Sequence, residues 1–267
     1  MIDPYLQAEY DNSAKIAGSD TLLATLPGLA AAFRAQHPHA EYGLRYGPSP
    51  RQVLDVFWPS ADPSAPLVLF MHGGYWQHSD RSAWSHVAAG LLAHGIGVIM
   101  PSYDLCPAVT MTALVANVRS VVPMLYARYG RPMLAIGHSA GGHLAATLLA
   151  TDWTAHGLPA NAIHAAMPIS GLFDLPPICR THQNDALHMD ETEARTLSPM
   201  FLPAPGKPIT AMVGGDEGAE YTRQSRELAA NWGGHWESLP GLHHFNVVGE
   251  LTSPSARLTQ VAVGLVK

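Results

Sequence analysis

Short apolar runs alternate with longer amphipathic segments along most of the chain. Five of the runs are continuously apolar, which is typical of strands buried on both faces of a parallel sheet; they span residues 66–71, 97–101, 132–137, 162–170 and 208–214. Segments with helical patterning and flanking Gly or Pro stand between them, at residues 82–94, 111–129, 140–151 and 221–232. This alternation predicts right-handed crossovers and an α/β fold with a mostly parallel sheet.

The ends of the chain extend this pattern. Residues 51–58 predict an earlier strand, paired antiparallel with residues 44–46 at one edge, and residues 235–239 predict a last short strand, which gives about eight strands. Ser253 as a helix N-cap and Pro254 at the first helical position predict a C-terminal helix.

Two segments do not fit the alternation. Residues 1–40 contain a predicted helix over 19–36, and residues 172–205 are rich in Pro, His and Met. No Gly/Ser linker separates two domains, so we expect a single domain over residues 1–267 with helices on both faces of the sheet. The two segments are candidate lid elements over a site.

Composition narrows the class of protein. Only 13% of residues are charged and 47% are hydrophobic, which excludes intrinsic disorder. The net charge of −6 and the absence of a basic run argue against a nucleic-acid partner. No apolar stretch is long enough for a membrane span, and the Met1–Gln7 stretch does not resemble a signal peptide. With two distant cysteines, Cys106 and Cys179, a reducing cytoplasm is expected.

One motif predicts a nucleophile. Residues 137–141 read Gly-His-Ser-Ala-Gly, a G-x-S-x-G pattern that exposes its serine on a sharp turn from a strand to a helix. The apolar run 133–136 precedes the motif and helical patterning follows it, which is the context the turn requires. Ser139 is therefore the expected nucleophile.

A second glycine motif predicts an oxyanion hole, the set of donors that binds the charge developing on a carbonyl oxygen. Residues 72–76 read His-Gly-Gly-Tyr-Trp directly after a predicted strand. We expect the backbone N–H groups of Gly74 and Tyr75, together with that of Ala140, to face the substrate carbonyl. The alternative is a plain glycine-rich turn.

A serine hydroxyl also needs a base and an acid that orients the base. His244, in a loop after the last predicted strand, is the expected base, with its neighbour His243 as the alternative. The acid should follow the strand at 208–214. Glu217, three positions after the first glycine there, is favoured over Asp216, and Asp174 is a third candidate.

With these residues in hand, the chain resembles the kynurenine formamidase (arylformamidase) branch of the α/β-hydrolases, near the HGG-motif esterases. The likeness covers roughly residues 66–260. It rests on the motifs at residues 72–77, 137–146, 152–157, 170–175, 220–225 and 244–245. The family acid stands three positions before the glutamate that corresponds to Glu220, which again selects Glu217, although animal members have Asp there.

The resemblance implies an α/β-hydrolase fold and hydrolysis of an aryl formamide, with N-formyl-kynurenine as the namesake substrate in tryptophan breakdown. Ser139 would attack the formyl carbon, His244 would protonate the leaving nitrogen, and water would clear the acyl-enzyme. No metal or organic cofactor is implied. Trp76, His138 and Phe173 are expected to contact the substrate, and Tyr75 could share the aromatic wall with them.

Other functions compete with this interpretation. A carboxylesterase of short-chain or aryl esters would use the same residues, and another acyl-arylamide would also fit. Two alternatives belong to other functional classes. One is a catalytically inactive hydrolase-fold protein that binds a small ligand. The other is a metal-dependent amidase, whose metal ligands would come from His182, His188, Asp185 and Asp190. Arg180, Arg195 and Arg223 are candidates to pair a substrate carboxylate. The family resemblance hints at a homodimer.

Overall fold

An eight-stranded sheet forms the centre of the molecule in the computed structural model, which describes residues 1–266. The strands are β1 (Ala40–Arg45), β2 (Val53–Phe57), β3 (Leu67–Met71), β4 (Gly97–Pro101), β5 (Met133–His138), β6 (Ile163–Ile169), β7 (Thr210–Gly214) and β8 (His235–Leu239). Their order across the sheet is β1-β2-β4-β3-β5-β6-β7-β8.

The sheet is mostly parallel. Only the β1–β2 and β2–β4 pairs are antiparallel, and every strand pair from β4 through β3 to β8 is parallel. The expected α/β class and the antiparallel edge are therefore confirmed. Because the parallel strands end at the same edge, the loops that follow β3, β5, β7 and β8 meet there.

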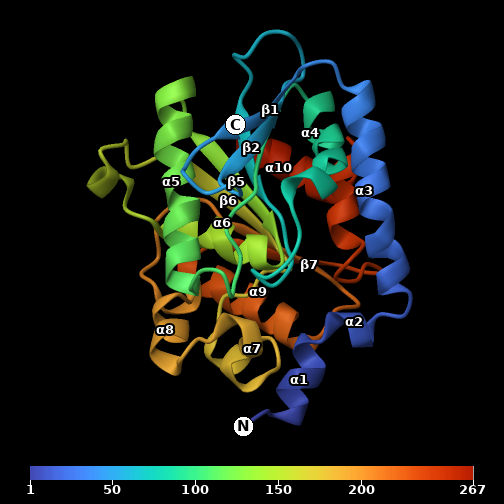
Figure 1. The fold of residues 1–267 in the computed structure, drawn as a ribbon, viewed down its shortest axis with the longest axis vertical. Helices are drawn as coiled ribbons and strands as arrows, with labels where there is room; N and C mark the ends of the chain where they lie inside the picture. The colour runs from blue at the N-terminus through green and yellow to red at the C-terminus, as the bar shows by residue number, and fades with distance from the viewer. Residues whose placement is uncertain (267) are drawn as a thin grey trace.

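Each central strand is buried on both faces. In β5, Met133 and Ala135 join one apolar cluster, while Leu134 and Ile136 join the other. The first cluster includes side chains of α5 (Met111–Tyr129), α6 (Ala140–Ala150) and α9 (Ala219–Trp232), and the second includes side chains of α3 (Ser19–Gln36), α4 (Ala89–Ala93) and α10 (Arg257–Val266). Figure 1 shows α5 and α3 on opposite sides of the sheet. Within residues 1–266, no helix has the length and apolar character of a membrane span.

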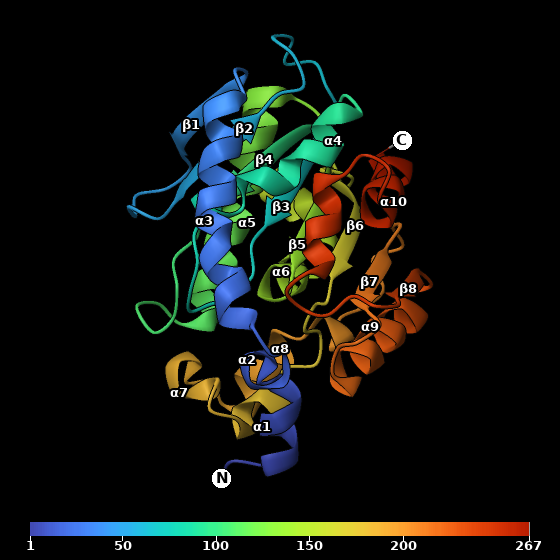
Figure 2. The ribbon, with the colours of Figure 1, turned by 90° about the vertical axis from the view of Figure 1, so that its right-hand side faces the viewer.

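The two segments outside the alternation lie together. The short helices α1 (Pro4–Tyr10) and α2 (Asn12–Lys15) come from the N-terminal segment, and α7 (Asn184–Leu187) and α8 (Glu191–Thr196) come from the segment between β6 and β7. Figure 2 shows all four gathered at one end of the molecule. The chain turn at Pro176–Arg180 contacts α1, α7 and α8, which joins the two segments.

Two predicted helices differ from the observed ones. Residues 82–94 form 3₁₀ turns at Arg81–Ala83 and Ser85–Ala88 before the short α4, because the backbone leaves helical geometry at Trp84, whose indole N–H donates to Ser79 Oγ over 2.7 Å. The C-terminal helix begins at Arg257 and not at Ser253 or Pro254. The Glu250 carboxylate accepts the Arg257 N–H over 2.9 Å and so takes the capping role expected of Ser253.

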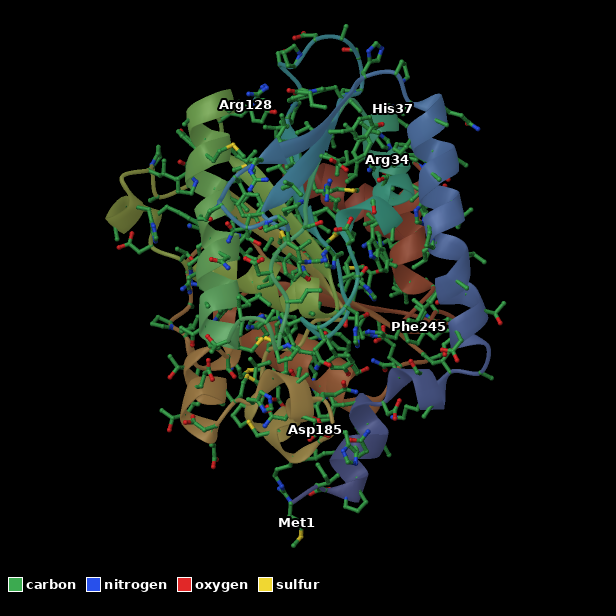
Figure 3. The ribbon with its side chains drawn as sticks, in the orientation of Figure 1. Met1, Arg34, His37, Arg128, Asp185 and Phe245 are labelled. Atoms are coloured by element: carbon green, nitrogen blue, oxygen red, sulfur yellow. The ribbon has the colours of Figure 1, made fainter. Side chains whose placement is uncertain are left out.

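A buried carboxylate fastens α3 to the sheet. Asp55 of β2, whose side chain is only 1% exposed, lies 2.6 Å from the guanidinium of Arg34 and 3.0 Å from that of Arg81. It also accepts the backbone N–H of Gly43 over 2.8 Å. Figure 3 shows Arg34 between α3 and the sheet, whereas Arg128, which pairs with Glu41, lies at the outer end of α5. Losing a partner of a buried charge destabilises far more than losing an exposed pair.

We therefore expect Arg34→Gln to lower the free energy of unfolding by about 2 kcal/mol or more. Its matched control is Arg128→Gln, which breaks an exposed ion pair and should cost less than about 1 kcal/mol. Urea unfolding followed by circular dichroism measures both. Equal losses in the two variants would contradict the role assigned to Asp55.

Candidate active site

The turn between β5 and α6 holds Ser139 in a strained conformation. Its backbone angles are φ 57° and ψ −120°, which an L-residue rarely adopts. The turn is possible because two glycines lack a Cβ: one added at Gly137 would overlap the carbonyl of Gly141, and one added at Gly141 would overlap the carbonyl of Met71. The packing of this turn against the end of β3 therefore fixes where the Ser139 hydroxyl lies.

Ser139, His244 and Glu217 form a continuous hydrogen-bonded array. The Ser139 Oγ lies 3.0 Å from His244 Nε2, and His244 Nδ1 lies 2.7 Å from Glu217 Oε2. The side chains of His244 and Glu217 are 3% and 0% exposed, so water does not compete for these bonds. When Nδ1–H donates to the carboxylate, Nε2 is left as an acceptor for the serine proton.

The Glu217 carboxylate is itself held in place. Its Oε1 accepts the Gly214 backbone N–H over 2.7 Å and the hydroxyl of Ser170. Ser170 follows β6 and Gly214 ends β7, so two neighbouring strands position the acid. Ser170 begins the motif at residues 170–175, but nothing in that local pattern shows that its hydroxyl meets a residue 47 positions away.

The competing candidates lie elsewhere. Asp216 is exposed, and its backbone N–H donates to the Leu242 carbonyl over 2.9 Å. Asp174 is paired with Arg223 over 2.9 Å. The Nδ1 of His243 accepts the backbone N–H of Phe245 over 3.2 Å, so its ring supports the turn that carries His244. None of the three faces the serine.

The loop after β3 places backbone donors beside Ser139. Gly74, Tyr75 and Trp76 all have positive φ, at 116°, 49° and 57°. Within residues 1–266, the N–H groups of Gly74, Tyr75 and Ala140 donate to no protein acceptor. Free donors next to a nucleophile are what binding of an oxyanion requires.

Distant side chains hold this loop in its strained form. The Tyr75 hydroxyl lies 2.5 Å from the Tyr10 carbonyl and 2.6 Å from the Tyr221 hydroxyl, which also accepts from Asn12 over 2.7 Å. On the other side of the loop, the His72 ring lies 2.7 Å from the Gly73 carbonyl. Tyr10 and Asn12 stand in no motif of the sequence, and Tyr221 stands in the motif at residues 220–225 with no role expected for it.

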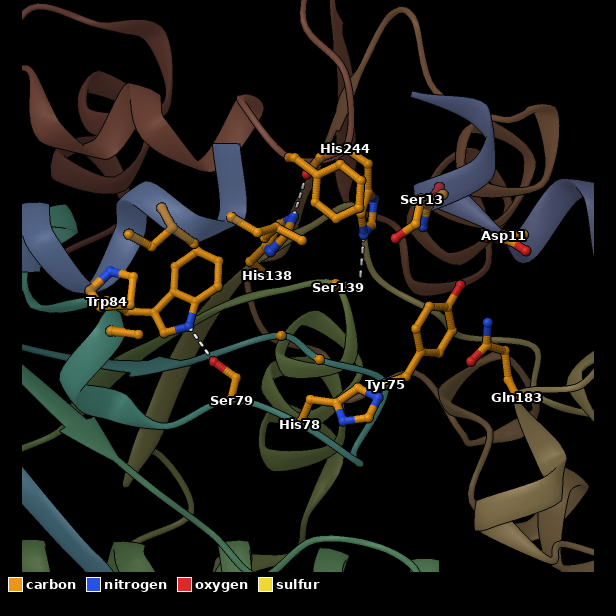
Figure 4. Close-up of a pocket in the computed structure, with 18 residues that line it drawn as sticks. Asp11, Ser13, Tyr75, His78, Ser79, Trp84, His138, Ser139, Gln183 and His244 are labelled. Atoms are coloured by element: carbon orange, nitrogen blue, oxygen red, sulfur yellow. Dashed lines mark hydrogen bonds between the residues drawn. The ribbon is translucent and has the colours of Figure 1, made fainter. Parts of the chain in front are cut away.

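These groups open into a cavity of about 380 Å³. Figure 4 shows Trp84 on one side of Ser139 and Tyr75, Asp11 and Gln183 on the other. The remaining lining residues are Asn12, Ser13, Leu23, Leu26, Pro27, Gly73, Gly74, His78, Ser79, Ala83, His138, His244 and Phe245.

The aromatic wall differs from the expected one. Tyr75 and His138 line the cavity, but Trp76 and Phe173 do not and are fully buried in the core. Trp76 packs edge-on against His143, with 5.2 Å between ring centroids, and the Phe173 backbone N–H donates to Gln224 over 2.6 Å. The local sequence shows that an aromatic residue lies near Ser139 along the chain, but it does not show whether the side chain points into the cavity or into the core.

The residues of the metal-site alternative do not converge. His182 Nδ1 lies 3.0 Å from Asp185 Oδ2 as an exposed pair. Across the described residues 1–266, no three or more His, Cys, Asp and Glu side chains gather as a metal ion would require.

Known proteins resemble this chain in sequence and in fold. Residues 54–197 match the BD-FAE family. The kynurenine formamidase of Danio rerio is 32% identical over 235 residues, which are 83% of this chain and 80% of that protein. The crystal structure of a provisionally assigned thioesterase from Silicibacter sp. TM1040 is 35% identical, with a TM-score of 0.89 over 97% of this chain and 98% of its own. An esterase from Pyrobaculum calidifontis shares the fold at 17% identity, with a TM-score of 0.73 over 100% and 98% of the two chains.

Three buried histidines surround the site. Burial lowers the pKa of His72 and of His143 to about 4, and it lowers the pKa of His138 well below the ordinary value, with the nearby His244 adding to the effect. In the unfolded chain the pKa of a histidine is near 6.5. The unfolded chain therefore binds more protons than the folded one below that pH, so the stability is complete above about pH 6.5 and is lost as the pH falls toward 4.

We expect the free energy of unfolding to fall between pH 7.5 and pH 5.0, with His72 and His143 each accounting for about 2 kcal/mol of that loss. His143→Gln can keep a donor to the Leu197 carbonyl, which the His143 ring contacts over 2.8 Å, and should reduce the pH dependence by about one proton. The exposed His156→Gln is the control and should leave the slope unchanged. Urea titrations at several pH values measure the slope, and an unchanged slope in His143→Gln would refute the assignment.

Proposed function

The chain belongs to the kynurenine formamidase family of α/β-hydrolases, and on that premise we propose that it hydrolyses an aryl formamide through a formyl-enzyme. N-formyl-kynurenine is the substrate that the family name indicates, with kynurenine and formate as the products. The observation that carries the proposal is the array of Ser139, His244 and Glu217, joined over 3.0 Å and 2.7 Å.

Acylation begins at the serine. His244 Nε2 takes the proton as Ser139 Oγ bonds to the formyl carbon, and the buried Glu217 carboxylate stabilises the imidazolium that forms. The carbonyl oxygen becomes an oxyanion that accepts from the N–H groups of Gly74, Tyr75 and Ala140. These donors need no rearrangement because the strained loop already holds them.

Collapse of the intermediate breaks the bond between carbon and nitrogen. His244 returns its proton to the aniline nitrogen, which leaves as the free arylamine. Water then gives a proton to the same His244 as it attacks the formyl ester, and formate departs from a regenerated Ser139.

The cavity suits an aryl leaving group. Trp84, Phe245, Leu23 and Leu26 supply an apolar wall next to Ser139. Asn12 and Leu23 come from the N-terminal segment, and Gln183 comes from the segment between β6 and β7. We propose that these two segments act as the lid elements of a single domain.

A carboxylesterase is the second candidate function. The same array attacks esters, and the cavity of about 380 Å³ offers much more room than a formyl group alone needs. The likeness to the Pyrobaculum calidifontis esterase shows the shared fold. Direct comparison of an aryl formamide with a short-chain ester therefore separates the two functions.

We further propose a cytoplasmic enzyme that acts on a small molecule and not on nucleic acid. Cys106 and Cys179 are both free thiols, which suits a reducing compartment. A homodimer stays a prediction, which light scattering during size-exclusion chromatography tests.

We expect the purified protein to hydrolyse N-formyl-kynurenine with a higher kcat/KM than p-nitrophenyl acetate. Ser139→Ala should lose at least about 10³-fold in kcat on both substrates while keeping its fold, because no other group can form the acyl-enzyme. Initial rates measure the activities, and circular dichroism checks the fold. Turnover of the ester alone would favour the carboxylesterase, and full activity of Ser139→Ala would exclude the serine mechanism.

Substitution of the two neighbouring acids distinguishes their roles. Glu217→Gln should lower kcat about 10³- to 10⁴-fold, because the amide no longer stabilises the imidazolium or fixes its tautomer. Asp216→Asn is the matched control, and we expect its kcat to stay within about twofold of the wild type because its side chain is exposed. A larger loss in Asp216→Asn would reassign the acid.

A further inference from the structure

The cavity at Ser139 has an unusual balance of charge for a site that takes an amino-acid derivative. Among the described residues that line it, Asp11 is the only acidic side chain, and none is Arg or Lys. A free amino acid has both an ammonium and a carboxylate group. The charged partner on the protein therefore matches the ammonium and not the carboxylate.

The three arginines that could pair a carboxylate are engaged elsewhere. Arg180 lies 2.6 Å from Asp3, and Arg223 lies 2.8 Å from Glu220. The guanidinium of Arg195 lies over the ring of Phe201, 4.0 Å from its centroid. None of the three lines the cavity. These three arginines therefore contribute no positive charge to the lining of the cavity at Ser139.

Asp11 lines the cavity and has a carboxylate with few protein donors. It lies between α1 and α2 and is half-buried. Its Oδ1 accepts the Ala14 N–H over 3.1 Å, and its Oδ2 has only a 3.4 Å contact with the Gln7 amide. The nearby Lys15 is paired with Glu9 over 2.5 Å and does not neutralise it. A carboxylate has about four acceptor positions, so Asp11 can receive an ammonium group while it caps α2.

The two sides of the cavity differ in character. Figure 4 shows Trp84 on one side of Ser139, and Asp11, Ser13 and Gln183 on the other. A ring that packs against Trp84 can direct two adjacent substituents away from that wall. One substituent is the formamide, which lies at Ser139. The adjacent substituent extends toward the side of the cavity that holds Asp11, Ser13 and Gln183.

We propose that Asp11 is a specificity-determining residue that binds the ammonium group of the substrate. The proposal rests on the proposed function and narrows it to aryl formamides with an amine-bearing chain on the adjacent ring position. Substrates that carry only a negative charge on that chain are rejected, since a carboxylate facing Asp11 is repelled and has no cation to pair with.

Three aryl formamides distinguish the contribution of the substrate ammonium group from that of its carboxylate group. N-formyl-kynurenine has both groups, formylkynuramine has the ammonium alone, and 4-(2-formamidophenyl)-4-oxobutanoate has the carboxylate alone. The wild type should hydrolyse the two amine-bearing compounds with a kcat/KM at least about tenfold above that of the third. Comparable rates on all three would overturn the proposal.

The variant Asp11→Asn keeps an oxygen for the cap and removes the charge. We expect it to lose about tenfold or more in kcat/KM on the amine-bearing substrates, mainly through KM, while the rate on the carboxylate-only substrate stays unchanged or rises. Asp3→Asn is the matched control, because Asp3 caps α1 but does not line the cavity, and its selectivity should equal that of the wild type. An equal loss by Asp11→Asn on all three substrates would show a structural role only.

A binding measurement separates this proposal from the proposed function. Calorimetric titration of Ser139→Ala with kynuramine and with 4-(2-aminophenyl)-4-oxobutanoate needs no turnover. Tighter binding of kynuramine, abolished by adding Asp11→Asn, supports the ammonium site even if no formamide is hydrolysed. Equal affinities for both compounds would refute it even if the formamidase activity is present.

Discussion

The close approach of the turn at Ser139 to the end of β3 is the constraint on which the site depends. Two chain segments meet there with no space for a side chain at Gly137 or Gly141. Because β5 is paired with β3 on one side and with β6 on the other, this contact fixes the hydroxyl relative to the loops after all three strands. The positions of His244, Glu217 and the backbone donors follow from the same strand edge.

The strain of the loop after β3 is balanced by bonds from distant parts of the chain. Tyr75 reaches the Tyr10 carbonyl and the Tyr221 hydroxyl, so the first ten residues and α9 both restrain it. An isolated loop with three consecutive positive φ angles would relax to a lower-energy form. The tyrosine contacts make the strained form the stable one, and they also join the N-terminal segment to the sheet edge that carries Ser139.

The sheet could be predicted largely because its signal is local, and the residues of the proposed active site also stand in local motifs. Continuous apolar runs indicate buried strands, and the spacing from Gly214 selects Glu217, which the structure places against His244. The cavity wall has no such local signal, because Asp11 and Trp84 reach it only through tertiary packing. The same reason explains why Trp76, beside the donors in sequence, is directed into the core. The C-terminal helix is capped by Glu250 and not by Ser253, because the Glu250 carboxylate accepts the Arg257 N–H. The sequence pattern at Ser253 and Pro254 does not show this contact.

The hydrogen bonds that join α1 and α2 to α9 bear on the order of assembly during synthesis. Tyr10 bonds with Glu220 and Gln224, and Asn12 bonds with Tyr221, all in α9. The first helices leave the ribosome more than 200 residues before these partners, as the separations of 209 to 214 positions show. Strands β2 to β6 precede α9 in the chain and are therefore synthesised before it. The helices α1 and α2 must therefore wait for α9, and the cavity at Ser139 is completed only after residues 219–232 have been synthesised.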